Sequence, residues 1–192
     1  IDFGSRVSAL APQFGKAGQL KSTFAAEVAM GLQREGLRVN HSTRPQDVLR
    51  GQAWGEFLGR TRSTSVAPGG ASILDYEGRL NRRVRGLGAR LADTSSMQRW
   101  LLRGFEEGPA MLVHGPRLFE TVSAGSVAII PEEHAPEYFV PFRHFIPFRT
   151  RQGFAKILSL LRDAEAWAAI VNAARSLVLT LPELTYRGFV TS

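Results

Sequence analysis

Residues 117–131 read RLFETVSAGSVAIIP, and this short stretch indicates both a helix and the strand that follows it. Glu120 lies near the start of an amphipathic run, Gly125 is placed to end a helix, and residues 127–130 are apolar and largely β-branched. A helix that leads directly into a strand is typical of a parallel sheet. In such a fold a helix start can hold a phosphate group, and a fixed carboxylate there can accept hydrogen bonds from a ribose diol.

The same alternation of helices and strands extends through the chain. We expect helices at residues 21–34, 45–59, 78–92, 95–106, 117–125, 153–161 and 164–179, with a last helical turn at 185–190. We expect strands at residues 6–10, 37–40, 110–113, 127–130 and 144–148, and short extended segments within 60–66 and at 72–75. The pattern predicts an α/β fold, a Rossmann-like parallel sheet with helices on both faces, in which 110–113 is a buried strand. Pro141 and Pro147 bound the last strand and indicate that it lies at an edge.

Composition narrows the classes of protein and site. The chain has 192 residues, of which 44% are hydrophobic, which suits one domain with its own core. It has no cysteine, which excludes disulfides, thiolate metal sites and a cysteine nucleophile and fits a reducing compartment, so we expect a cytoplasmic protein. Charged and polar residues interrupt the longest apolar run, 164–181, and no transmembrane segment is expected. The four histidines lack the spacing of a zinc site.

The net charge of +7 has two interpretations. A basic surface attracts polyanions such as nucleic acid, anionic lipid or a nucleotide sugar. Alternatively, the densest basic run is the solvated face of a helix. In that interpretation Arg79, Arg82, Arg83, Arg85 and Arg90 face solvent, and the buried face consists of Leu80, Val84, Leu87 and Leu91.

Several residues near predicted helix starts are candidates for binding an anion. Arg6, Lys16 and Lys21 surround the first strand-to-helix loop, which in this fold lies at the carboxyl ends of the strands where ligands bind. Arg117 can reach a phosphate, or it can pair with Glu120 three positions along the same helix. His114 is either a ligand-binding or a structural histidine. Exposed basic residues of a basic protein remain the alternative for Arg6 and Lys21.

The segment RLFETVSAG, with YFVP at 138–141 and HFIPF at 144–148, resembles the donor-binding half of bacterial GT-B glycosyltransferases. The resembled group has an Arg-x-Phe-Glu-x4-Gly pattern, and the likeness extends to Tyr186. It implies that Glu120 binds the ribose of the nucleotide and that Arg6 and Lys21 neutralise the diphosphate. It also likens GGAS at 69–72, with Asp75, to a Gly-x-Ser/Asp stretch of that group; a solvent-exposed turn is the other interpretation. A wider GT-B pattern has a second acid eight positions before Glu120, where this chain has Leu112, so how the sugar is held stays open. The alternative for Glu120 is a carboxylate favoured by the helix dipole.

This resemblance implies one nucleotide-sugar-binding domain over residues 1–192. Because the chain starts without Met inside an apparent first strand, we expect an acceptor domain upstream and no sugar transfer by this chain alone. The acceptor and the catalytic residues are not identified, and neither a metal nor another cofactor is required if basic residues carry the diphosphate. Ser-His-Asp order, a phosphate-binding GxxxxGK[ST] loop and paired carboxylates do not stand out. The alternative function is a non-catalytic basic α/β module that binds nucleic acid or another polyanion.

Overall fold

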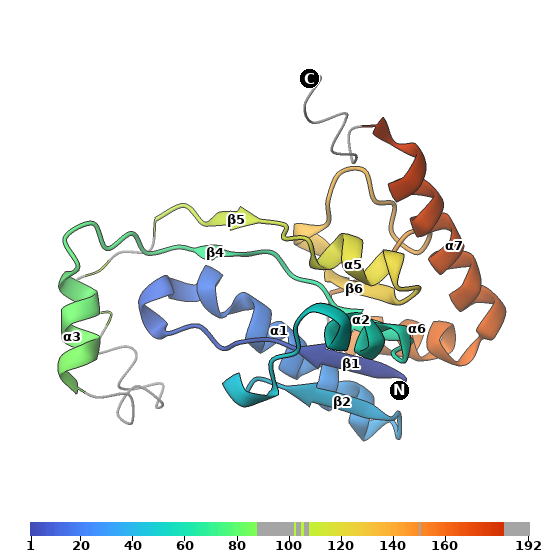
Figure 1. The fold of residues 1–192 in the computed structure, drawn as a ribbon, viewed down its shortest axis with the longest axis horizontal. Helices are drawn as coiled ribbons and strands as arrows, with labels where there is room; N and C mark the ends of the chain where they lie inside the picture. Colours follow the sequence, from blue (N-terminus) through green and yellow to red (C-terminus); the bar gives the residue numbers. More distant parts are fainter. Residues whose placement is uncertain (88–101, 103–104, 106–107, 150, 183–192) are drawn as a thin grey trace.

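A computed structural model describes residues 1–87, 102, 105, 108–149 and 151–182, and its centre is a five-stranded sheet (Figure 1). The strands are β1 (Phe3–Arg6), β2 (Val39–Ser42), β3 (Ser63–Ser65), β6 (Val127–Pro131) and β7 (Ile146–Phe148). Their order is β2-β1-β3-β6-β7, and every neighbouring pair is parallel. The predicted parallel sheet is confirmed, with β7 at an edge, and the strand order changes direction at β1 and β3.

Helices cover both faces of this sheet, as predicted. Along β6, Val127 and Ile129 point into one core with α1 (Gly15–Arg34) and α6 (Arg151–Arg162). Ala128 and Ile130 point into the opposite core, which packs against α5 (Arg117–Ser123). A third cluster, on α2 (Gly51–Gly59), lies beside the end of α5. Helix α7 (Ala164–Thr180) contributes to both main cores. The described residues also form three 3-10 turns: η1 (Pro12–Phe14), η2 (Pro45–Asp47) and η3 (Glu132–His134).

A two-stranded antiparallel ribbon lies outside the main sheet and extends over α1 towards α3 (Arg79–Leu87) in Figure 1. Its strands are β4 (Gly69–Ala71) and β5 (Met111–Val113). The prediction of a buried strand at 110–113 is therefore wrong, because β5 pairs with β4 alone and exposes 60% of Met111 and 70% of Val113. The two strands touch closely at Gly70, where a Cβ would lie 1.7 Å from the Met111 carbonyl oxygen.

Helix α3 supports the solvated-face interpretation of the arginine run. Leu80 is fully buried, whereas the four arginines of α3 are exposed: Arg79, Arg82, Arg83 and Arg85. Arg90, Leu91 and the predicted helix at 95–106 fall on or among residues outside the described ranges, and so does the helical turn expected at 185–190.

The glycines that were expected to end helices do so. Gly36 after α1 and Gly125 after α5 have φ angles of +78° and +79°, which side chains with a Cβ rarely adopt. After α5, the amides of Gly125 and Ser126 donate to the carbonyls of Val122 and Thr121, as in a Schellman ending. This ending turns the chain directly into β6.

The beginnings of the first elements differ from the prediction. The first strand spans Phe3–Arg6 rather than 6–10, so Arg6 is its last residue. Helix α1 begins at Gly15, which puts Lys21 in its second turn rather than at its start. The helix expected from Pro45 is interrupted, because the backbone is extended at Val48 and α2 begins only at Gly51. No helix in the described ranges is long and apolar enough to cross a membrane.

Candidate functional site

The predicted site residues come from elements that meet at the carboxyl ends of β1 and β3. Arg6 ends β1 and Arg117 begins α5, and the Arg117 guanidinium donates a hydrogen bond to the backbone carbonyl of Arg6. In an open parallel sheet, the crevice beside the strands where the order reverses is the usual ligand site. A crevice is expected at this place, and we give the name β1/β3 crevice to the residues around these strand ends, which are described in turn.

Arg117 is held by two contacts besides its bond to Arg6. Its guanidinium lies 4.5 Å from the ring centroid of Trp54, in the geometry of a cation–π contact. Burial lowers the pKa of Arg117, and the nearby charge of Glu120 raises it. The structure thus places Arg117 within electrostatic reach of Glu120 and ties it to the end of β1, and phosphate binding by Arg117 stays a prediction.

Lys21 reaches the crevice from α1. Its side chain covers Gly69, since a Cβ on that glycine would lie 2.6 Å from Nζ. Burial lowers the pKa of Lys21, and the positive charge of Arg117 lowers it further. Two partly buried positive charges thus repel each other, and an anion bound near both would relieve the repulsion and the lost hydration.

Arg6 lies at the side of the crevice nearest β2. Its guanidinium donates to the carbonyls of Ser5 and Asn40, each at 2.9 Å, and to Asn40 Oδ1 at 2.7 Å. The group also lies 4.4 Å from the ring centroid of Phe57 on α2. Burial lowers the pKa of Arg6, and Asp47 opposes this change. Much of this arginine's hydrogen bonding is directed to the protein, and its buried Nε has no partner.

Two histidines border the crevice. Burial lowers the pKa of His114, the charges of His134 and Lys21 add to the effect, and a hydrogen bond with the His134 backbone opposes it. Burial also lowers the pKa of His41, with Arg6 as the second cause. Both shifts favour the neutral ring, and within the described part of the chain the Nδ1 atom of each is buried without a hydrogen-bond partner. Sequence reasoning singled out His114 but missed His41, whose only signal is its place at the end of a strand.

Glu120 lies one turn into α5 and is exposed, which leaves its carboxylate accessible. The indole Nε1 of Trp54 donates to its Oε2 atom at 2.9 Å. Trp54 lies within the helix predicted at residues 45–59, and nothing in its local sequence indicates a partner 66 positions away.

Asp75 and Ser72 have structural roles in the described part of the chain. The carboxylate of Asp75 accepts hydrogen bonds from the Leu80 and Asn81 amides at the start of α3. The Ser72 hydroxyl accepts a hydrogen bond from the Ala17 amide at 3.2 Å. The GGAS stretch therefore joins the ribbon to α1, and Lys21 packs over its first glycine.

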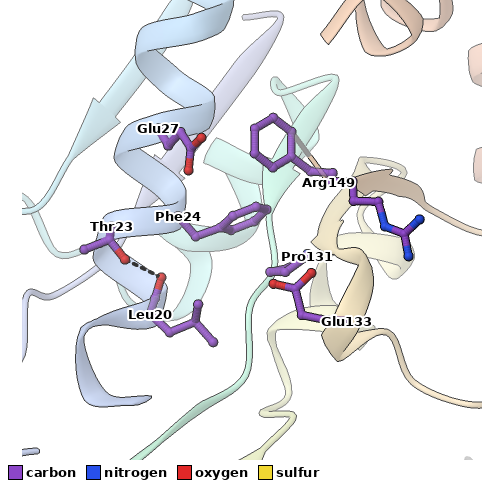
Figure 2. Close-up of a pocket in the computed structure, with 8 residues that line it drawn as sticks. Leu20, Thr23, Phe24, Glu27, Pro131, Glu133 and Arg149 are labelled. Atoms are coloured by element: carbon purple, nitrogen blue, oxygen red, sulfur yellow. Dashed lines mark hydrogen bonds between the residues drawn. The ribbon is translucent and has the colours of Figure 1, made fainter. Parts of the chain in front are cut away.

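A separate pocket of about 370 Å³ opens between α1 and the ends of β6 and β7 (Figure 2). Thr23, Phe24 and Glu27 line it from α1, and Glu133 and Arg149 line it from the opposite side, with the Arg149 guanidinium pointing away from α1 in Figure 2. The residues that line it do not include any of the predicted site residues. We place the candidate site at the β1/β3 crevice, because Arg117 is hydrogen-bonded to the end of β1 there and lies within electrostatic reach of Lys21 and Glu120.

A comparison with protein families finds one match that covers well over half of the chain. The family model described as "Glycosyl transferase-like" matches residues 49–188. The matched range contains Trp54, His114, Arg117 and Glu120, whereas Arg6 and Lys21 precede it. Comparisons with curated proteins and with solved structures gave no match.

Proposed function

Since the chain belongs to the glycosyl transferase-like family, we propose that its β1/β3 crevice binds the nucleoside diphosphate part of a sugar donor. Family membership supports glycosyl transfer as the general chemistry. The diphosphate, the ribose and their binding residues are the content of the proposal.

The observation that carries the proposal is the pair of like charges on Lys21 and Arg117. Burial lowers the pKa of both groups, and Arg117 also lowers that of Lys21. A diphosphate would bring negative charge to a place where these two positive charges repel each other. During transfer the departing nucleoside diphosphate gains negative charge, and positive groups held in advance stabilise it without reorganising. Arg6 borders the same crevice, and neutral His114 can accept or donate one hydrogen bond.

Glu120 is the proposed ribose ligand. A carboxylate has about four sites for accepting hydrogen bonds, so the bond from Trp54 leaves room for both hydroxyls of a ribose diol. Each hydrogen bond to a charged group contributes about 1.5–3 kcal/mol. We further propose that a facing domain binds the acceptor, because every residue proposed here acts on the nucleotide.

The proposal is tested by thermal unfolding with UDP, GDP, ADP and CDP. A diphosphate present at about 100 times its Kd raises the free energy of unfolding by about 2.7 kcal/mol. Glu120→Gln should reduce the stabilisation that the bound diphosphate provides. Glu165→Gln is the matched control, since Glu165 also lies in the first turn of a helix. Equal behaviour of the two variants would identify Glu120 as an ordinary dipole-favoured residue.

The second candidate function is binding of a polyanion, which the four exposed arginines of α3 would contact from the solvent side. Binding of this kind to DNA or RNA weakens steeply as salt rises. Steep salt-dependent binding to DNA or RNA, together with no stabilisation by any nucleoside diphosphate, would favour that function over the first.

A further inference from the structure

We infer that Trp54 and Phe57, the aromatic pair of α2, are positioning residues for Glu120, Arg117 and Arg6. The inference rests on the proposed function, since it assigns a role to side chains that support the nucleotide ligands. Neither aromatic residue is needed to touch the nucleotide itself.

The pair carries one arginine on each ring. The rings of Trp54 and Phe57 are stacked, with centroids 5.7 Å apart and planes inclined by 23°. Arg117 lies 4.5 Å from the Trp54 centroid, and Arg6 lies 4.4 Å from the Phe57 centroid. A cation over an aromatic face is attracted by the ring quadrupole, so the pair favours the arrangement in which both guanidinium groups stay at the crevice.

Trp54 also holds the carboxylate. Its Nε1–H donates to Glu120 Oε2 at 2.9 Å, so one indole fixes both a proposed ribose ligand and a proposed phosphate ligand. Side chains that are already ordered lose less conformational freedom when a ligand binds. The indole N–H therefore acts on ribose recognition, while the ring face acts on phosphate recognition.

Core packing holds the two aromatic rings in place. Trp54 and Phe57 are buried, and with Leu58 they form a core cluster against Ile1, Leu49 and Ala124. The position of the two rings is therefore set by packing in α2, before any ligand binds.

Trp167 provides a matched control within the same chain. Its Nε1 donates to the Arg62 carbonyl at 2.9 Å, and the Arg62 guanidinium lies 5.3 Å from its ring centroid. It makes the same kinds of contact as Trp54, but with a residue that is not part of the proposed site. Loss of Trp167 reports what such contacts contribute to stability alone.

The experiment compares Trp54→Phe, Trp54→Leu and Trp167→Phe with the unaltered chain by calorimetric titration. The probes are the diphosphate among UDP, GDP, ADP and CDP that binds tightest, its 2′,3′-dideoxy form and the corresponding nucleoside. Trp54→Phe keeps a ring and removes the N–H, so the preference for ribose over dideoxyribose should fall about two- to tenfold. Its preference for diphosphate over nucleoside should stay unchanged. Trp54→Leu should reduce both preferences, and Trp167→Phe neither.

The outcomes separate the two proposals. If the unaltered chain binds none of the diphosphates, the proposed function is refuted and this inference with it. If it binds a diphosphate with a clear ribose preference that Trp54→Phe leaves intact, only the positioning role is refuted. An equal loss in Trp167→Phe would also refute it. Should Trp54→Leu fail to fold, Trp54→Phe alone decides, because it retains an aromatic ring in the core.

Discussion

Replacing Lys21 by methionine should maintain or raise the stability of the fold and should weaken the binding of a nucleoside diphosphate. Lys21 is half-buried, and both influences on its pKa, burial and the Arg117 charge, disfavour its positive charge. Methionine has a similar length and an apolar end, so Lys21→Met removes the repulsion and keeps the packing over Gly69. The free energy of unfolding should stay the same or rise by up to about 1 kcal/mol, which is a Tm increase of up to about 2–4 °C.

The same substitution should weaken binding of a nucleoside diphosphate. A hydrogen bond to a charged group contributes about 1.5–3 kcal/mol, so the diphosphate should bind about 10- to 150-fold more weakly to Lys21→Met. Affinity for the nucleoside should not change, since the lost charge acts on the phosphates. The assay is a titration with both ligands alongside thermal unfolding.

Arg34→Met is the matched control, because Arg34 is an exposed cation in the last turn of the same helix. It should leave the preference for diphosphate over nucleoside unchanged. A large Tm decrease in Lys21→Met, with unchanged diphosphate affinity, would show that Lys21 is a structural residue and would refute the reasoning.

Three further predictions concern the fold. Burial lowers the pKa of His41, His114 and His144, so the unfolded chain takes up protons first as the pH falls. The Tm should therefore decrease below about pH 6.5, and a Tm that stays constant between about pH 7 and 5 would contradict this. Gly70→Ala should lower the Tm because its Cβ would overlap a backbone oxygen of β5. Gly55→Ala has open space around it in α2 and should raise the free energy of unfolding by about 0.5–1 kcal/mol, and equal Tm changes in the two variants would refute the contrast. Asp163→Ala removes the side-chain cap of α7, which accepts from two amides at 3.0 Å, and denaturant unfolding should show a loss of about 1 kcal/mol, with no change counting against the cap.

The elements that sequence predicts best have local signals at their ends. Gly36 and Gly125 end α1 and α5 where expected, because only glycine readily adopts the required φ. The strand at 110–113 has the right position and the wrong environment. An apolar triplet does not reveal whether its partner is the main sheet or, as here, a separate ribbon with β4.

The first strand shows how tertiary contacts decide what local pattern does not. Residues 3–6 read FGSR, a weak strand signal, yet Gly4 has no room for a Cβ beside Phe57 and Thr61. The hydroxyl of Ser5 bonds that of Ser65 on the neighbouring strand. Packing of this kind favours small residues, which propensity scales disfavour in strands.

Some residues of the candidate site have a local signal in the sequence, and others depend on tertiary contacts. The helix start bearing Arg117 and Glu120 is visible in the sequence, and the roles of both residues stay predictions. The supporting Trp54 is not visible, because its bond to Glu120 spans 66 positions and depends on how α2 and α5 meet. A functional carboxylate has a motif around it, whereas the residue that orients it needs only to be nearby in space.

The proline in β7 has a consequence for how copies of the chain meet one another. An edge strand offers unpaired amides and carbonyls, and a second molecule can add its own strand there and begin to aggregate. Pro147 sits in the middle of β7, in register with Ile130, and it lacks an amide hydrogen. With a strand of only three residues, this edge offers too few donors to template a neighbour. The missing amide hydrogen of Pro147 thus disfavours the addition of a further strand at β7, and edge-to-edge association on that side is disfavoured.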